Sequence, residues 1–63
     1  GLMSFRTQDL AFNHYRNKGF KYDNSMSIRE DKWYIFRKGN RYVVITPKYD
    51  SILGTNWIAR AWS

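Results

Sequence analysis

The stretch WYIFRKGNRYVVIT, residues 33–46, constrains the fold of this chain more than any other segment. Two apolar runs flank Gly39-Asn40, a pair typical of the two-residue loops that close β-hairpins. Such a loop also fixes the register, so that Lys38 faces Arg41 and the pairing continues as far as Trp33 opposite Thr46. We expect the second run to end before Pro47, because proline has no N–H to donate to a ladder. The segment therefore predicts an antiparallel hairpin.

Both faces of this hairpin carry apolar side chains, because residues alternate between the faces of a strand. One face carries Tyr34, Phe36, Lys38, Arg41, Val43 and Ile45. The other face carries Trp33, Ile35, Arg37, Tyr42, Val44 and Thr46. A single helix covers only one of them. The second face must be closed by residues 47–55 or by a partner molecule, or remain a partly solvent-exposed aromatic surface.

The N-terminal third of the chain carries the signals of a helix from about residue 5 to residue 18. Ser4 or Thr7 is a candidate N-cap. Gly19 is the expected left-handed residue after the helix, and Phe20 is expected to fold back onto its last turn. The predicted apolar stripe consists of Phe5, Ala11, Phe12 and Tyr15.

The other segments complete one small domain. Residues 21–27 are polar and contain turn formers, residues 47–55 are predicted to be a loop, and residues 56–62 are predicted to be a third strand. The predicted fold class is α+β, with one N-terminal helix packed on a three-stranded antiparallel meander in two layers.

A single domain spanning residues 1–63 is expected, because a chain this short has no room for a second core. Gly1 and Leu2 are interpreted as a cloning remnant ahead of Met3 as the natural start, and residues 1–3 together are expected to be a tag remnant or a disordered end.

The charge of the chain narrows the choice of partners. Eleven Lys and Arg residues against five Asp and Glu give a net charge of +6. Such a field attracts phosphate groups, anionic lipid or an acidic protein surface. The alternative is that the charge serves solubility alone.

Sequence signals of catalysis and of cofactor binding are missing. There is no cysteine, so neither a disulfide nor a thiolate metal site is possible, and His14 is the only histidine. Glu30 and Asp31 are adjacent, so in a strand they point to opposite faces and do not form an acid–base pair. We therefore expect no enzyme, no metal and no cofactor. No apolar run reaches the ~20 residues that a membrane span requires, and a cytoplasmic location without membrane contact is expected.

The preferred hypothesis is a small basic nucleic-acid-binding accessory protein that uses a sheet face and the hairpin tip. Aromatic side chains stack on bases while cations follow the phosphates, and a two-stranded ribbon also fits the major groove of a duplex. Phosphate contacts are assigned to Arg37, Lys38, Arg41 and Arg60, with Lys48, Lys18 and Lys21 extending the basic surface. Stacking or wedging is assigned to Trp33, Tyr42 and Trp62.

A protein-interaction module is the alternative, since aromatic and arginine side chains are also typical of protein-binding hot spots. The short, cysteine-free chain, rich in Asn, Lys and Tyr, is similar in composition to phage-encoded accessory proteins. In that case the partner is an acidic host protein, and the chain inhibits or modulates a host nucleic-acid-processing enzyme. A homodimer that buries the second face against itself is a third possibility beside a monomer.

Overall fold

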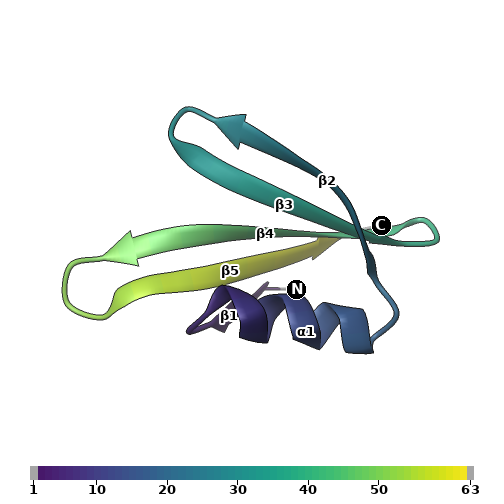
Figure 1. Cartoon of the computed structure of the whole chain (residues 1–63), viewed down its shortest axis with the longest axis horizontal. Coiled ribbons are helices and arrows are strands. Elements are labelled where there is room, and N and C mark those ends of the chain that lie inside the picture. Colours follow the sequence, from purple (N-terminus) through teal and green to yellow (C-terminus); the bar gives the residue numbers. More distant parts are fainter. Residues whose placement is uncertain (1, 63) are drawn as a thin grey trace.

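The computed structural model describes residues 2–62, in which one helix packs on one face of a five-stranded antiparallel sheet (Figure 1). The strand order is β1-β5-β4-β3-β2, so that four consecutive strands form a meander and the N-terminal strand pairs with the last one. The elements are β1 (Leu2–Phe5), α1 (Gln8–Asn17), β2 (Lys21–Ile28), β3 (Asp31–Lys38), β4 (Arg41–Asp50) and β5 (Gly54–Trp62).

The predicted three-stranded meander is wrong, because the sheet has two more strands. Residues 21–28 form β2 rather than a polar turn. Strand β1 takes in Leu2 and Met3, which were interpreted as a tag remnant or a disordered end, together with Ser4 and Phe5, which were predicted to cap and begin the helix. Strand β5 begins at Gly54, so the predicted loop over residues 47–55 is reduced to the turn at residues 51–53. The β1–β5 pairing joins the two ends of the described chain, and β2 pairs with the adjacent β3 although its polar sequence lacks the pattern of a strand, so local residue preferences encode neither strand.

Strand β4 also continues through Pro47, contrary to the prediction. The predicted hairpin register is confirmed from Lys38 opposite Arg41 to Tyr34 opposite Ile45. In this register the backbone groups of Arg41 and of every second residue after it point toward β3. The N–H that Pro47 lacks would therefore point toward β3, beyond the last β3–β4 pair, where no ladder bond is lost. Pro47 remains paired with β5 on its other side.

The helix begins three residues later than predicted. Thr7 is the N-cap, and its Oγ1 accepts a hydrogen bond from the N–H of Leu10 at 3.1 Å. The other candidate cap, Ser4, lies in β1. Because residues 2–5 are extended in β1, the helix cannot begin before the β1–α1 connection, and Thr7 in that connection becomes the N-cap.

The predicted end of the helix is confirmed. Gly19 has φ 95°, its N–H donates to the carbonyl of Arg16 at 2.9 Å, and the N–H of Phe20 donates to the carbonyl of Tyr15 at 3.0 Å. These two bonds define a Schellman motif. The ring of Phe20 lies 5.7 Å from that of Tyr15, as expected for the apolar contact of this motif.

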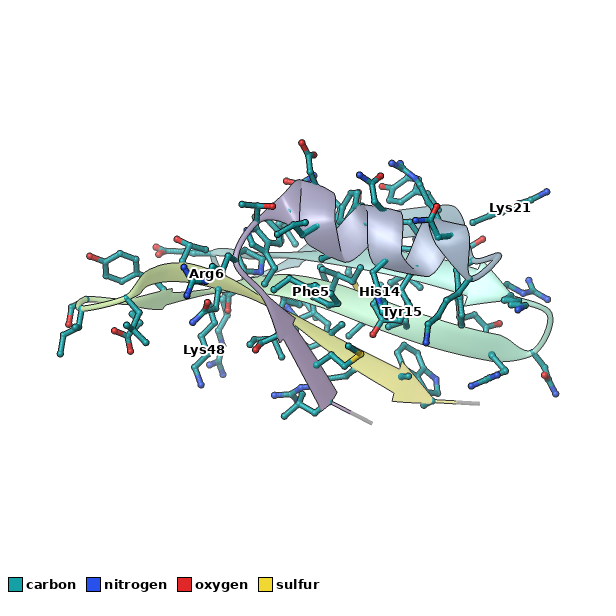
Figure 2. All side chains as sticks on the ribbon, turned by 90° about the horizontal axis from the view of Figure 1, so that it is seen from below. Phe5, Arg6, His14, Tyr15, Lys21 and Lys48 are labelled. Carbon is teal, nitrogen blue, oxygen red and sulfur yellow. The ribbon has the colours of Figure 1, made fainter. Side chains whose placement is uncertain are left out.

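The core lies between α1 and the sheet, where Phe5, His14 and Tyr15 are seen in Figure 2. Phe12 is central to it: its ring meets those of Tyr34 and Phe36 edge-on, at 5.2 and 4.9 Å. Burying each such ring contributes roughly 1.5–3 kcal/mol. The buried cluster consists of Ala11, Phe12, Tyr15, Phe20, Phe36, Val43, Ile45 and Ala59. The helix therefore covers the face of Phe36, Val43 and Ile45.

Strands β3 and β4 pair over only part of their length. Beyond Tyr34 and Ile45, β3 stays paired with β2 while β4 stays paired with β5, and the two hairpins diverge (Figure 1). We call the space between residues 31–33 and residues 46–48 the fork. No helix within residues 2–62 is long and apolar enough to cross a membrane.

Candidate nucleic-acid interface

The sheet face opposite α1 is the candidate interface, and we call it the open face. Within residues 2–62 no helix lies on this side, and Figure 2 shows Lys48 pointing away from α1. The strand registers assign its members as Leu2, Ser4, Lys21, Asn24, Met26, Ile28, Asp31, Trp33, Ile35, Arg37, Tyr42, Val44, Thr46, Lys48, Asp50, Asn56, Ile58, Arg60 and Trp62. Residues 47–55 do not fold over it, because they extend β4 and β5 and form the turn between them.

Six of the eight predicted site residues share this face: Trp33, Arg37, Tyr42, Lys48, Arg60 and Trp62. The other two, Lys38 and Arg41, lie at the hairpin tip but on the helix side. There they line a hollow of about 320 Å³ together with Tyr15 and Phe20. Their side chains therefore do not join the open face, although they extend its basic end.

A row of three side chains crosses β3, β4 and β5. Arg37, Tyr42 and Trp62 are direct neighbours in the registers. The rings of Tyr42 and Trp62 are stacked, 5.5 Å apart with an 18° interplanar angle, and the Arg37 guanidinium lies 5.7 Å from the Tyr42 ring centre. Trp62 remains 48% exposed. The solvent-facing side of this row is therefore accessible to a further planar group that stacks on the Trp62 ring.

The open face is partly covered by its own side chains. Val44 is only 6% exposed although no helix packs on it. Trp33, Ile35, Tyr42 and Ile58 are half-buried around it, while Arg37 and Arg60 are exposed. The face is thus a shallow apolar surface rimmed by cations, and its rings are neither fully exposed nor hidden inside the core.

Cations gather at one end of the molecule, which we call the basic pole. It consists of Lys18, Lys21, Arg37, Lys38 and Arg41. Lys21 lies directly opposite Arg37 and Lys38 directly opposite Arg41. Lys38 Nζ donates to the carbonyl of Lys18 at 2.6 Å, which joins the helix end to the hairpin tip. Like charges directly opposite each other destabilise a sheet, so this arrangement has a cost in stability.

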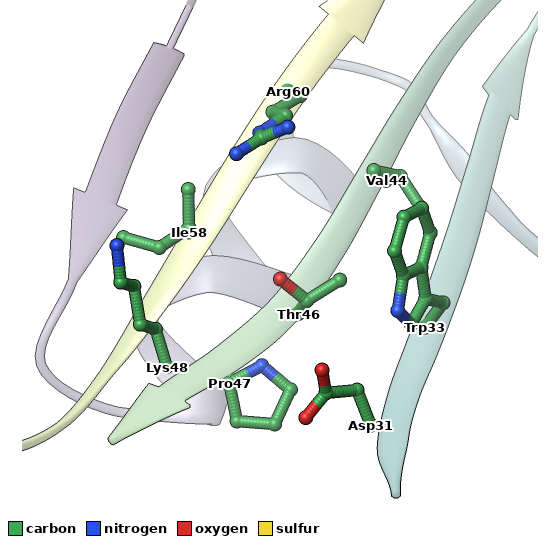
Figure 3. A pocket seen from close by; sticks show the side chains of 8 residues that line it. All are labelled: Asp31, Trp33, Val44, Thr46, Pro47, Lys48, Ile58 and Arg60. Carbon is green, nitrogen blue, oxygen red and sulfur yellow. The ribbon is translucent and has the colours of Figure 1, made fainter. Parts of the chain in front are cut away.

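The fork contains a hollow of about 270 Å³ on the open face (Figure 3). Asp31 and Trp33 border it on the β3 side, and Ile58, Lys48 and Arg60 border it on the opposite side (Figure 3). Its lining also includes Val44, Thr46 and Pro47. The prediction from sequence missed Asp31, Thr46 and Ile58, because it assumed β3–β4 pairing as far as Trp33 and Thr46. The signal was Pro47, which cannot donate toward β3.

Tyr15 on the helix and Asp50 at the end of β4 have pKa values that are shifted from their ordinary values. Burial raises the pKa of the Tyr15 phenol above its ordinary value of 10.0. The N–H groups of Leu53 and Ile52 lower the pKa of Asp50 in the β4–β5 turn.

His14 Nε2 is buried beside Phe5 and Tyr15 and has no hydrogen-bond partner among the described residues. No group of three metal-ligating side chains comes together in residues 2–62.

No protein-family model, no curated protein and no solved structure matches this chain.

Proposed function

We propose that this protein is a small basic nucleic-acid-binding accessory protein that holds a single strand on its open face. The observation that carries the proposal is the face itself, where Trp33, Tyr42 and Trp62 share one surface with Arg37 and Arg60. Stacking of a base on an aromatic ring contributes ~1–3 kcal/mol, and cations between the rings track the phosphates. A cytoplasmic location is part of the proposal.

The basic pole supports the same function. Two pairs of like charges face each other there, Lys21 with Arg37 and Lys38 with Arg41. Such pairs lower the stability of the free protein, and an anionic partner removes the repulsion. A phosphate backbone that leaves the open face at this end would meet cations on both sides of the sheet edge.

A single strand fits this surface better than a duplex. Unstacked bases expose their faces to rings, whereas the bases of a duplex are already stacked on one another. The hairpin tip, which was predicted to reach into a major groove, holds two of its cations in place: Lys38 donates to the carbonyl of Lys18, and Arg37 Nε donates to the carbonyl of Gly39 at 2.7 Å. These bonds reduce the reach of the tip.

Binding of labelled oligonucleotides across a salt series tests the proposal. If about five phosphates are neutralised, the plot of log affinity against log salt should have a slope of about −3.5 for single strands and about −4.5 for duplex DNA. We expect binding with the shallower slope and a preference for single strands. A flat slope, or no binding at low salt, contradicts the proposal.

Matched variants assign the binding to the open face. Arg60→Gln and Trp62→Leu change exposed residues of this face and should each weaken binding about five- to tenfold, as loss of a phosphate or stacking contact predicts. Lys32→Gln and Tyr49→Leu remove a similar cation and ring from positions with the opposite orientation, and should leave affinity within about twofold. Equal losses in both pairs would mean that binding does not use the open face.

A protein-interaction module is the second candidate, and one surface favours it. Tyr49, Ile52 and Leu53 at the β4–β5 turn are 76%, 89% and 75% exposed. Large exposed apolar groups that lie close together are typical of protein contacts. The variant Ile52→Ser with Leu53→Ser separates the two functions. The variant should bind oligonucleotides as tightly as the wild type. If the module has a protein partner, a pull-down after nuclease treatment should recover that partner in stoichiometric amount with the wild type but not with the variant.

A further inference from the structure

We propose that the fork is a base-reading subsite that selects guanine over the other bases. The inference rests on the proposed function, because it gives the bound single strand a specific position. It is carried by one juxtaposition: the Asp31 carboxylate and the Trp33 indole line the same hollow of the open face as Lys48 and Arg60.

The size of the hollow suits a single base. Its volume of about 270 Å³ lies just below the ~300–1,000 Å³ of typical small-molecule pockets. Val44 and Ile58 contribute apolar surface to the lining, and the Trp33 side chain borders the hollow on the side of β3 (Figure 3). A base that enters it meets apolar surface and an indole, which are the partners of an unstacked ring.

Asp31 supplies the selection. A carboxylate on a phosphate-binding surface lowers affinity by repulsion unless it accepts hydrogen bonds from the ligand. Guanine presents two adjacent N–H donors on its Watson–Crick edge, which match the two oxygens of a carboxylate. Cytosine and adenine offer one amino group beside an acceptor, and thymine and uracil offer an N–H between two carbonyl oxygens. A carboxylate therefore favours guanine first and disfavours thymine and uracil.

Cations stand across the hollow from this carboxylate. Lys48 and Arg60 lie on the side of β4 and β5, while Asp31 and Trp33 lie on the side of β3 (Figure 3). This separation lets a base edge face Asp31 while the sugar–phosphate backbone of the same nucleotide runs past the cations. The hydroxyl of Thr46, between the two sides, is a further donor or acceptor for the base.

The test compares two oligonucleotides of about eight nucleotides, oligothymidine and the same strand with one central deoxyguanosine, by fluorescence anisotropy. The wild-type protein should bind the guanine-containing strand about five- to tenfold more tightly, in line with a good bidentate base contact. Asp31→Asn should abolish this preference, by weakening the guanine strand and strengthening oligothymidine. Glu30→Gln is the matched control: it removes the same charge from the neighbouring residue, which does not line the hollow.

The outcomes separate the two proposals. If neither strand binds, the proposed function fails and the subsite fails with it. If both strands bind and Asp31→Asn tightens both by the same factor as Glu30→Gln, Asp31 acts only through its charge and the base-reading proposal alone is overturned. Loss of the guanine preference in Asp31→Asn but not in Glu30→Gln supports it. A circular dichroism spectrum and melting curve like those of the wild type show that each variant is folded.

Discussion

Asp50 is the residue that turns the expected loop into a tight connection. The N–H groups of Ile52 and Leu53 donate to its Oδ1 at 2.8 and 2.9 Å, so the carboxylate organises the turn between β4 and β5. The same two bonds, with that from Leu53 the larger influence, hold the pKa of Asp50 below its ordinary value of 3.8. The charged form is therefore the one that the folded chain prefers.

We predict that Asp50 stabilises the fold at neutral pH and ceases to do so in acid. Its pKa is lowered in the folded state, so its contribution is complete above the unfolded value near 3.8 and is lost as the pH falls through the folded value. Asp50→Asn keeps an oxygen acceptor but removes the titration. Its melting temperature should lie below that of the wild type at about pH 6, and the difference should shrink toward about pH 2.

The control for this prediction is Glu30→Gln in the β2–β3 turn, for whose carboxylate the described residues provide no hydrogen-bond donor. The difference between Glu30→Gln and the wild type should depend less on pH. A constant gap between Asp50→Asn and the wild type over the whole range would show that the turn bonds do not depend on the charge.

Strand β2 shows why an element is harder to predict than a residue. Its sequence, KYDNSMSI, lacks the alternation of a half-buried strand, and its pairing with β3 shifts register at Asp23. The turn that follows has Arg29 at φ 59°, a conformation in which glycine and asparagine are far commoner. Nothing local therefore marks a hairpin. The strand forms because β3, stabilised by the core, presents an edge to it.

The same strand carries one of the opposed pairs of the basic pole, and we predict a trade between stability and binding. Lys21→Glu converts the Lys21–Arg37 repulsion into an attraction and should stabilise the fold by about 0.2–1 kcal/mol. It should also weaken oligonucleotide binding severalfold, since a cation becomes an anion. Chemical denaturation and anisotropy measure the two effects.

Lys32→Glu is the matched control for Lys21→Glu. It makes the same change of charge on exposed Lys32, which lies opposite Ser27 rather than a cation. It should gain less stability than Lys21→Glu. If both variants gain equally, the benefit comes from net charge and not from the opposed pair.

For the whole molecule, the net charge of +6 and its concentration at one end act on folding and on binding in opposite directions. Salt screens the repulsion within the free protein and also screens its attraction to phosphates. We predict that raising NaCl from about 0.05 to about 0.3 M increases the melting temperature by a few degrees while it lowers oligonucleotide affinity. Scanning calorimetry at each salt concentration measures the first effect.

This salt prediction has an internal control. In Lys21→Glu the opposed pair is already relieved, so its melting temperature should rise less over the same salt range. A melting temperature that falls with salt in the wild type would mean that attractive charge pairs, and not repulsion at the basic pole, dominate the stability of the fold.

The sequence by itself determined the features whose signals are local. Gly39 closed the predicted hairpin with φ 61°, and Gly19 with Phe20 ended the helix as expected. The alternation around Gly39-Asn40 placed Trp33, Arg37 and Tyr42 on one face, and that grouping stands. These predictions held because turn chemistry and side-chain alternation depend on neighbouring residues only.

Only the tertiary structure decided which face is open, how many strands pair and where the hairpins separate. Strand β1 pairs with β5 at the other end of the described chain, and β2 forms because the adjacent β3 offers it an edge. The fork exists because, beyond Tyr34 and Ile45, β3 stays paired with β2 while β4 stays paired with β5. The hollow beside Asp31 arises from this divergence. Where the β3–β4 pairing ends depends on which neighbour each strand keeps, and only the assembled sheet decides this. The sequence therefore predicted the aromatic and cationic side chains of the candidate site but not its carboxylate.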